Sequence, residues 1–424
     1  MSPQLPVGQD VSEDGRLPEG VGKGANNRTL SVYVHVPFCT VRCGYCDFNT
    51  YTNAELGPGA NRAEYLNSVL AELVHVDGVF QAANLPNRPV ETVFWGGGTP
   101  SLLPAQDITR FHEELNKRWP LAPNAEITLE ANPDTVDEAY FAELRAGGVS
   151  RVSIGMQSAV KHVLARLDRT HNVANVAKAV SAAKAVGLQV SLDLIYGTPS
   201  ESISDWRQTL ETALSHDVDH ISAYALVLEP GTAMFTQARQ GKFDFPNDDD
   251  QAAKYELTEE LLSATGFENY EISNWARRDA KGELMVCRHN LAYWKNQDWW
   301  GFGPGAHSFI GSSGPDNFGL RRWNRKHPLT YAKYLAEGKS PAAGQEIIDQ
   351  EATLIEQVML AVRLAGGLNL NELTVQTSLQ DLIDRSAELV KRGLIDAQAL
   401  NEQTIRLTKS GRLLADHVVK QLVF

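Results

Sequence analysis

The stretch Cys39-Thr-Val-Arg-Cys43-Gly-Tyr-Cys46 contains three of the four cysteines of this 424-residue chain. It follows the apolar segment Leu30–Val36, which predicts a buried strand. The cysteines are therefore expected on a loop at the carboxyl end of a strand, where α/β folds place their chemistry. Three thiolates at the spacing C-x3-C-x2-C can bind three irons of a [4Fe–4S] cube. The fourth iron is then open to a small ligand.

Two other uses of these cysteines are disfavoured. A disulfide framework fits poorly because the number of clustered cysteines is odd and the chain has few of them. A structural zinc site is the main alternative, with His35 or Asp47 as the fourth ligand. The spacing favours the iron–sulfur cluster, since zinc knuckles use paired C-x2-C units.

Composition limits the class of protein. The net charge of −13 disfavours binding to a nucleic acid backbone. No apolar run approaches the roughly 18 residues that a membrane helix needs, and the amino terminus lacks the pattern of a secretory signal. With so few cysteines, these features predict a cytoplasmic protein that is not an integral membrane protein.

Six short apolar segments alternate with amphipathic helical segments, which predicts an α/β fold, a partial (β/α)6 barrel over residues 30–231. Residues 1–29 are rich in glycine, proline and acidic residues and have no apolar period, so a disordered tail is expected. The expected strands are Leu30–Val36, Val90–Trp95, Ala125–Glu130, Ser150–Ile154, Leu188–Ile195 and His220–Leu228.

Two further regions follow the expected barrel. Residues 232–343 are rich in aromatic residues and glycine, and we expect them to close the open barrel and cover the site. Residues 344–424 show helical segments and two short β segments, Ala397–Asn401 and Thr404–Thr408, a pattern typical of a winged-helix domain. Eleven acidic and eight basic side chains over residues 345–424 disfavour DNA binding and favour a packing or docking role.

Polar residues end or interrupt several expected strands. In the segment Trp95-Gly-Gly-Gly-Thr-Pro100 the glycines let the backbone approach a ligand, although the segment can also be a simple tight turn. Glu130 ends the third strand, where a carboxylate points into the site of a barrel; the alternative is a capping or surface role. Asp193 lies inside the apolar fifth strand, which is costly unless the carboxylate is paired or binds a ligand. Arg169 can bind a carboxylate of a ligand, and the alternative is an ion pair with Asp193.

The cysteine spacing, with an aromatic residue just before the third cysteine, resembles the radical S-adenosylmethionine (SAM) superfamily. This resemblance implies a [4Fe–4S] cluster on Cys39, Cys43 and Cys46 whose open iron binds SAM. The segments Tyr33–Cys39, Phe94–Pro100, Ser153–Gln157 and Asp193–Pro199 are similar, more closely, to oxygen-independent coproporphyrinogen III oxidase. In that family the SAM contacts fall at positions that match Tyr33, Tyr45, Gly97, Gly98, Thr99, Glu130, Gln157, Arg169 and Asp193.

Two departures point to a subgroup of this family. Phe48 stands where the oxidases have a further cysteine, and the tail is shorter than their amino-terminal segment. The motif His289-Asn-Leu-Ala-Tyr-Trp294 resembles that of the HemW-type heme chaperones. The resemblance implies heme binding, with an axial ligand and aromatic packing drawn from His289, Asn290, Tyr293 and Trp294. The alternative for His289 is a buried histidine satisfied by its neighbours, and Cys287 is either a second ligand or a small core residue.

The expected function is a heme chaperone that binds heme and delivers it to heme-accepting proteins, with the membrane as one candidate location for these partners. No nucleic acid partner is expected. The alternative function is an oxygen-independent coproporphyrinogen III oxidase, so whether the chain is an enzyme stays open. Phe48 and the His289–Trp294 motif favour the chaperone.

Overall fold

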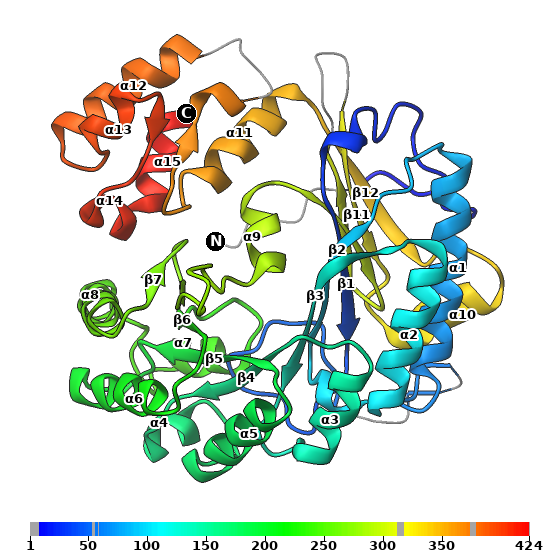
Figure 1. Ribbon diagram of the computed structural model, residues 1–424, viewed down its shortest axis with the longest axis horizontal. Coiled ribbons are helices and arrows are strands. Elements are labelled where there is room, and N and C mark those ends of the chain that lie inside the picture. The colour runs from blue at the N-terminus through cyan, green and yellow to red at the C-terminus, as the bar shows by residue number, and fades with distance from the viewer. Residues whose placement is uncertain (1–7, 53–55, 58, 312–317, 374–378, 424) are drawn as a thin grey trace.

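Six parallel strands form the centre of a twelve-stranded sheet in the structure, a computed structural model that describes residues 8–52, 56–57, 59–311, 318–373 and 379–423 (Figure 1). Each central strand lies within a few residues of the segment expected from the sequence, so the predicted α/β fold is confirmed. The sheet stays open, with β12 and β7 as its edge strands. The central strands are β1 (Leu30–Val36), β2 (Val90–Gly97), β3 (Leu121–Ala131), β4 (Arg151–Gln157), β5 (Gln189–Tyr196) and β6 (His220–Ala225).

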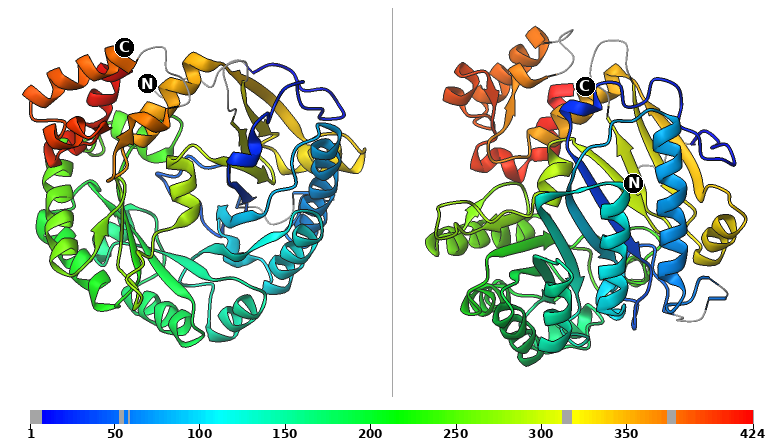
Figure 2. Two further views of the ribbon diagram at one scale, coloured as in Figure 1. Left: turned by 45° about the horizontal axis from the view of Figure 1, so that its top comes forward. Right: turned by 45° about the vertical axis from the view of Figure 1, so that its right-hand side comes forward.

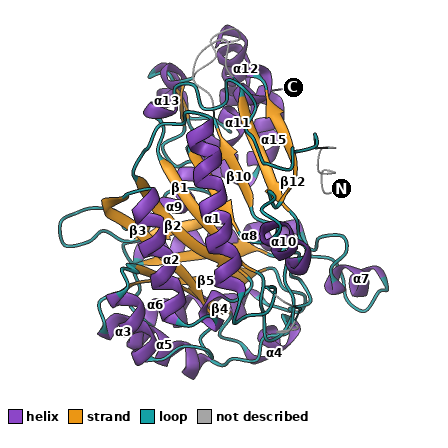
Figure 3. Cartoon of the chain, turned by 90° about the vertical axis from the view of Figure 1, so that its right-hand side faces the viewer, coloured by secondary structure: helices purple, strands orange, loops and turns teal. Residues whose placement is uncertain are grey.

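Helices between these strands cover the outer face of the curved sheet (Figure 2, left; Figure 3). In α2, Ile108, Phe111 and Leu115 are buried because their spacing places them on one side of the helix. None of the helices in the described ranges combines the length and apolarity that a membrane crossing demands. The outer helices are α1 (Tyr65–Ala82), α2 (Ala105–Arg118), α3 (Glu138–Ala146), α4 (Lys161–Arg166), α5 (Val173–Ala185) and α6 (Ile203–Ser215).

Residues 232–343 extend the sheet at both edges. One group of strands continues from β1, and its first member, β9, runs parallel to β1. The other group pairs with β6 in antiparallel orientation. The elements of this region are α7 (Ala233–Arg239), α8 (Asp248–Ala264), β7 (Glu268–Asn269), β8 (Asn274–Ala276), α9 (Arg288–Trp294), β9 (Asp298–Phe302), β10 (His307–Ile310), β11 (Gly319–Asn324) and α10 (Pro328–Ala336), followed by β12 (Ala342–Ile348).

The amino-terminal segment packs against this extended sheet, so the prediction of a disordered tail is wrong for residues 8–29. Leu17 and Val21 are buried in the main core, and the backbone N–H of Gln9 donates to the carbonyl oxygen of Gln345 in β12 at 2.8 Å. The tail lacks an apolar period, and its partners lie about 300 residues away, so local composition could not reveal this packing. Residues 1–7 lie outside the described ranges.

A buried ion cluster fixes the end of this segment. The carboxylate of Asp298, which is fully buried at the start of β9, accepts from Arg28 Nε at 2.5 Å and from Arg88 Nη1 at 2.8 Å. The backbone N–H of Gly311 donates to the same carboxylate at 2.8 Å. The buried carboxylate thus accepts from two guanidinium groups and one backbone N–H, although Arg88 Nε has no hydrogen-bond partner.

The carboxyl-terminal residues form a separate apolar cluster around Val358, Leu389 and Val418. The expected β segment Ala397–Asn401 is wrong: it is helix α13, capped by the Asp396 side chain, which accepts from the N–H of Ala399 at 2.8 Å. Residues 374–378 lie outside the described ranges. The elements here are α11 (Gln350–Ala361), β13 (Leu368–Asn369), α12 (Leu379–Lys391), α13, β14 (Thr404–Ile405), α14 (Lys409–Leu413) and α15 (Ala415–Val423), with β13 and β14 paired antiparallel.

Candidate functional site

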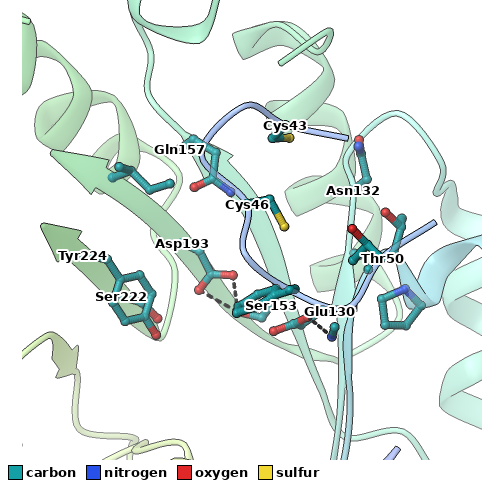
Figure 4. A pocket seen from close by; sticks show the side chains of 18 of the residues that line it. Cys43, Cys46, Thr50, Glu130, Asn132, Ser153, Gln157, Asp193, Ser222 and Tyr224 are labelled. Carbon is teal, nitrogen blue, oxygen red and sulfur yellow. Dashed lines mark hydrogen bonds between the residues drawn. The ribbon is translucent and has the colours of Figure 1, made fainter. Parts of the chain in front are cut away.

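A cavity of about 540 Å³ opens inside the partial barrel, between the cysteine loop (residues 39–46) and the carboxyl-terminal parts of the strands. Its size lies in the range of small-molecule sites. Figure 4 shows Cys46, Glu130, Gln157 and Asp193 around this space. Every residue predicted from the sequence to bind the cluster or SAM lines the cavity: Cys39, Cys43, Cys46, Tyr33, Tyr45, Gly97, Gly98, Thr99, Glu130, Gln157, Arg169 and Asp193.

The glycine-rich turn after β2 holds the cysteine loop in place. The N–H of Gly98 donates to the carbonyl oxygen of Val36 at 2.7 Å, and the N–H of Thr99 donates to that of Phe38 at 2.7 Å. A Cβ on Gly98 would come within 2.5 Å of the Phe38 oxygen, so only glycine allows this approach. The turn therefore acts on the cysteines through the backbone that precedes them.

Hydrogen-bond donors point at two of the three sulfurs. The hydroxyl of Thr99 lies 3.8 Å from Cys39 Sγ, and Arg169 Nη1 lies 3.8 Å from Cys43 Sγ. Donors to sulfur stabilise thiolates and tune iron–sulfur clusters, so this donor set fits three cluster ligands. In the described parts of the chain, no three His, Cys, Asp or Glu side chains are grouped closely enough to hold a single metal ion.

Two carboxylates form the electrostatic centre of the cavity. Burial and the neighbouring charge of Asp193 raise the pKa of Glu130 to about 8. The N–H of Gly97, which donates to Glu130 Oε2 at 3.1 Å, has the opposite, smaller effect on this pKa. Burial also raises the pKa of Asp193, opposed by hydrogen bonds from Ser153 and Ser222. A cationic ligand between the two carboxylates would favour their ionised forms.

Arg169 reaches the cysteine loop and forms no ion pair with Asp193. Its Nη2 donates to the carbonyl oxygen of Gly155 at 3.2 Å, while its buried Nε has no hydrogen-bond partner. A buried donor without a partner is costly, and a ligand carboxylate could satisfy it. The alternative of an Arg169–Asp193 pair is therefore not what the structure shows.

Backbone strain marks the end of β4. Gln157 has a φ of 61°, in the left-handed region that costs free energy for a residue other than glycine. The side chain of Gln157 lines the cavity from this position. Such strain concentrates at functional sites, where the surrounding fold enforces it.

Sequence reasoning missed two serines and a tyrosine. The hydroxyl of Ser153 donates to both oxygens of Asp193 at 2.9 Å, and Ser222 stands opposite Asp193 in the register of β5 and β6. The side chain of Tyr224, two residues further along β6, is hydrogen-bonded to Ser222 and Asn274. Ser153 was detectable, because it alternates with Gly155 and Gln157 on one face of a strand.

Helix α9 carries the heme candidates and packs inside the barrel, against β2 and β3. The carboxylate of Glu126 in β3 accepts from the backbone N–H groups of Arg288 and His289, each at 3.1 Å. A carboxylate at a helix amino terminus satisfies unpaired donors and interacts favourably with the helix dipole. Glu126 thus holds the start of α9.

Both ring nitrogens of His289 are engaged. Nδ1 lies 2.7 Å from the hydroxyl of Thr92, and Nε2 lies 2.9 Å from the hydroxyl of Tyr293. The ring stacks on Phe94 with centroids 5.1 Å apart, and burial lowers the pKa of His289 to about 3. In this structure His289 is a buried histidine satisfied by its neighbours, and its ligation of heme stays a prediction that requires one of these hydrogen bonds to break.

The other residues around the motif divide into cavity-lining and structural groups. Asn290 and Tyr293 line the cavity, whereas Trp294 is not among its lining residues. Cys287 also lines the cavity, and burial raises the pKa of its thiol to about 12, so the thiol is neutral in this structure.

A three-cysteine loop above an open parallel barrel, with a polar cavity beneath it, defines a radical SAM protein, and residues 33–213 match the radical SAM superfamily. The fold is similar to coproporphyrinogen III oxidase HemN of Escherichia coli, with a TM-score of 0.75 at 23% identity over 96% of this chain and 91% of that chain. A likeness at this identity shows the fold alone.

Within the superfamily, the chain belongs to the HemW family. It is 45% identical to the heme chaperone HemW of Mycobacterium tuberculosis over 93% of this chain and 95% of the relative. It is 31% identical to the heme chaperone HemW of Bacillus subtilis over 92% of this chain and 97% of that relative.

Proposed function

We propose that this protein is a cytoplasmic heme chaperone, which binds heme and delivers it to heme-dependent proteins. The observation that carries the proposal is the similarity to the heme chaperones HemW over nearly the whole chain, including both the barrel and the carboxyl-terminal residues. The heme-accepting proteins are its proposed partners.

The cavity beside the cysteine loop would bind the iron–sulfur cluster and SAM. Cys39, Cys43 and Cys46 would hold a [4Fe–4S] cluster that supplies an electron for the cleavage of SAM. The unpartnered Nε of Arg169 would bind the carboxylate of SAM, and the paired charges of Glu130 and Asp193 would balance its positive charge.

The alternative function, oxidation of coproporphyrinogen III, is less well supported. The fold likeness to HemN does not extend to its activity. Phe48, which lines the cavity beside the cysteine loop, stands where the oxidases have a further cysteine. We therefore expect no conversion of coproporphyrinogen III by this protein.

One experiment separates these functions. Protein reconstituted with iron and sulfide under anaerobic conditions is titrated with hemin and, separately, incubated with coproporphyrinogen III, SAM and a reductant. The chaperone predicts a Soret band from bound heme that survives gel filtration, with no protoporphyrinogen formed. Multiple turnovers of coproporphyrinogen III would overturn the proposal in favour of the oxidase.

A further inference from the structure

We propose that heme binds at the mouth of the cysteine cavity, on an apolar patch formed by Val41, Phe48 and Val227, rather than on His289. This inference rests on the proposed heme-binding function and names the site for it. Val41 and Phe48 come from the cysteine loop and its continuation, and Val227 follows β6. These three residues are called the mouth patch below.

The side chains of the mouth patch are apolar and exposed to solvent. Val41 is 46% exposed, Phe48 56% and Val227 62%, and all three line the cavity. Among the described residues, ten large apolar side chains are exposed, and four of them, including Tyr224, line this one cavity. Exposed apolar side chains gathered around one cavity are a feature of ligand-binding sites.

The local packing explains why Val227 faces outward. Leu226 and Leu228 are buried in an apolar cluster against which Tyr45 of the cysteine loop packs. In an extended segment, neighbouring side chains point to opposite sides, so Val227 turns away from that cluster. The N–H of Met234 also donates to the carbonyl oxygen of Gly44 at 2.9 Å, which ties this segment to the cysteine loop. The two sides of the mouth are thus held together.

The charges at the mouth suit an apolar disc with anionic groups at one edge. Arg42, exposed on the cysteine loop, lines the cavity and is in none of the ion pairs formed by the described residues. Its guanidinium can bind a carboxylate in a bidentate manner. Asp47 also lines the cavity, and its negative charge would repel the carboxylates of heme, so these carboxylates should face Arg42.

The two candidate sites differ in what heme must displace. At the mouth patch an apolar macrocycle covers side chains that are already exposed, and the gain comes from removing this area from water. At His289, which lines the inner part of the same cavity, heme must break a hydrogen bond of a buried ring. The mouth patch therefore offers binding without rearrangement of the barrel.

The test compares two valine-to-glutamate variants of the full, reconstituted protein. Val227→Glu places a charge in the mouth patch, whereas Val74→Glu places the same charge at a 54% exposed position on the outer helix α1. Hemin affinity is measured from the Soret band and from tryptophan fluorescence quenching. We expect Val227→Glu to weaken binding by about tenfold or more, because a charge against the macrocycle loses its water. Val74→Glu should leave the affinity unchanged, and both variants should keep the iron–sulfur absorbance of the parent protein.

Two further variants make the outcome decisive. Arg42→Ala should weaken hemin binding, by about fivefold for a lost charged hydrogen bond at a partly exposed site. His289→Ala should retain hemin at nearly the parent affinity. Equal affinities of Val227→Glu and Val74→Glu, or loss of heme only in His289→Ala, would overturn the mouth patch while leaving the heme chaperone standing. Failure of the parent protein to bind hemin would instead overturn the proposed function.

Discussion

Replacing Glu130 by glutamine tests how the cavity receives the positive charge of SAM. In the ligand-free protein, burial and the charge of Asp193 raise the pKa of Glu130 to about 8, so most molecules carry a protonated Glu130 at pH 7. A sulfonium cation favours the ionised carboxylate, and binding must therefore release this proton. One pKa unit corresponds to about 1.4 kcal/mol, so the affinity for SAM at pH 7 should lie about tenfold below its value above pH 8.

The direction of the pH dependence follows from the sign of the shift. Below pH 8 most Glu130 carboxyls are protonated and offer the cation no negative charge. SAM binding should therefore strengthen as the pH rises, and level off above that value. Glu130→Gln removes this dependence. Asp193→Asn removes the charge that contributes to the raised pKa of Glu130, so its midpoint should move to lower pH.

Equilibrium dialysis of SAM between pH 6.5 and 9 on reconstituted protein measures these profiles, and the thermal transition of each ligand-free variant is recorded as a control. The difference between the parent and Glu130→Gln isolates this carboxyl from the titration of SAM itself. Parallel profiles for these two proteins would refute the reasoning. A large fall in thermal stability of Asp193→Asn with unchanged affinity would show that Asp193 serves the fold instead.

Three further predictions concern the cluster and the stability of the fold. Iron and sulfide content after reconstitution should fall sharply in Cys43→Ser and stay at the parent level in Cys287→Ser; the reverse pattern would exclude the proposed ligands. Asp298→Ala leaves two buried guanidinium groups without their carboxylate, and should lower the free energy of unfolding in urea by about 3–5 kcal/mol. The exposed pair partner Asp14 provides the matched control, and Asp14→Ala should change stability little. Gly98→Ala forces a Cβ against a carbonyl oxygen, so SAM should bind more weakly, and an unchanged affinity would show that the loop can yield.

The amino-acid sequence by itself determined the central sheet and the composition of the site. The six parallel strands are short apolar segments, and their positions follow from the local pattern of apolar residues along the chain. The residues at their carboxyl ends, such as Glu130 and Gln157, then converge because parallel strands end at the same edge of a sheet. The cysteine spacing likewise depends on neighbours within eight residues.

Only the tertiary structure decided the features that depend on distant partners. Arg28, Arg88 and Asp298 are far apart along the chain. Their meeting in one buried cluster, together with the burial of Leu17 and Val21, orders a tail whose local composition predicts disorder. The state of His289 also depends on the tertiary structure. Its ring nitrogens are hydrogen-bonded to the hydroxyls of Thr92 in β2 and of Tyr293 one helical turn away. A motif shows which groups can ligate a metal, but whether their lone pairs are free depends on what the fold packs against them. Hydrogen bonds and buried charges are satisfied in space and not along the sequence, and this is why the local pattern could not supply them.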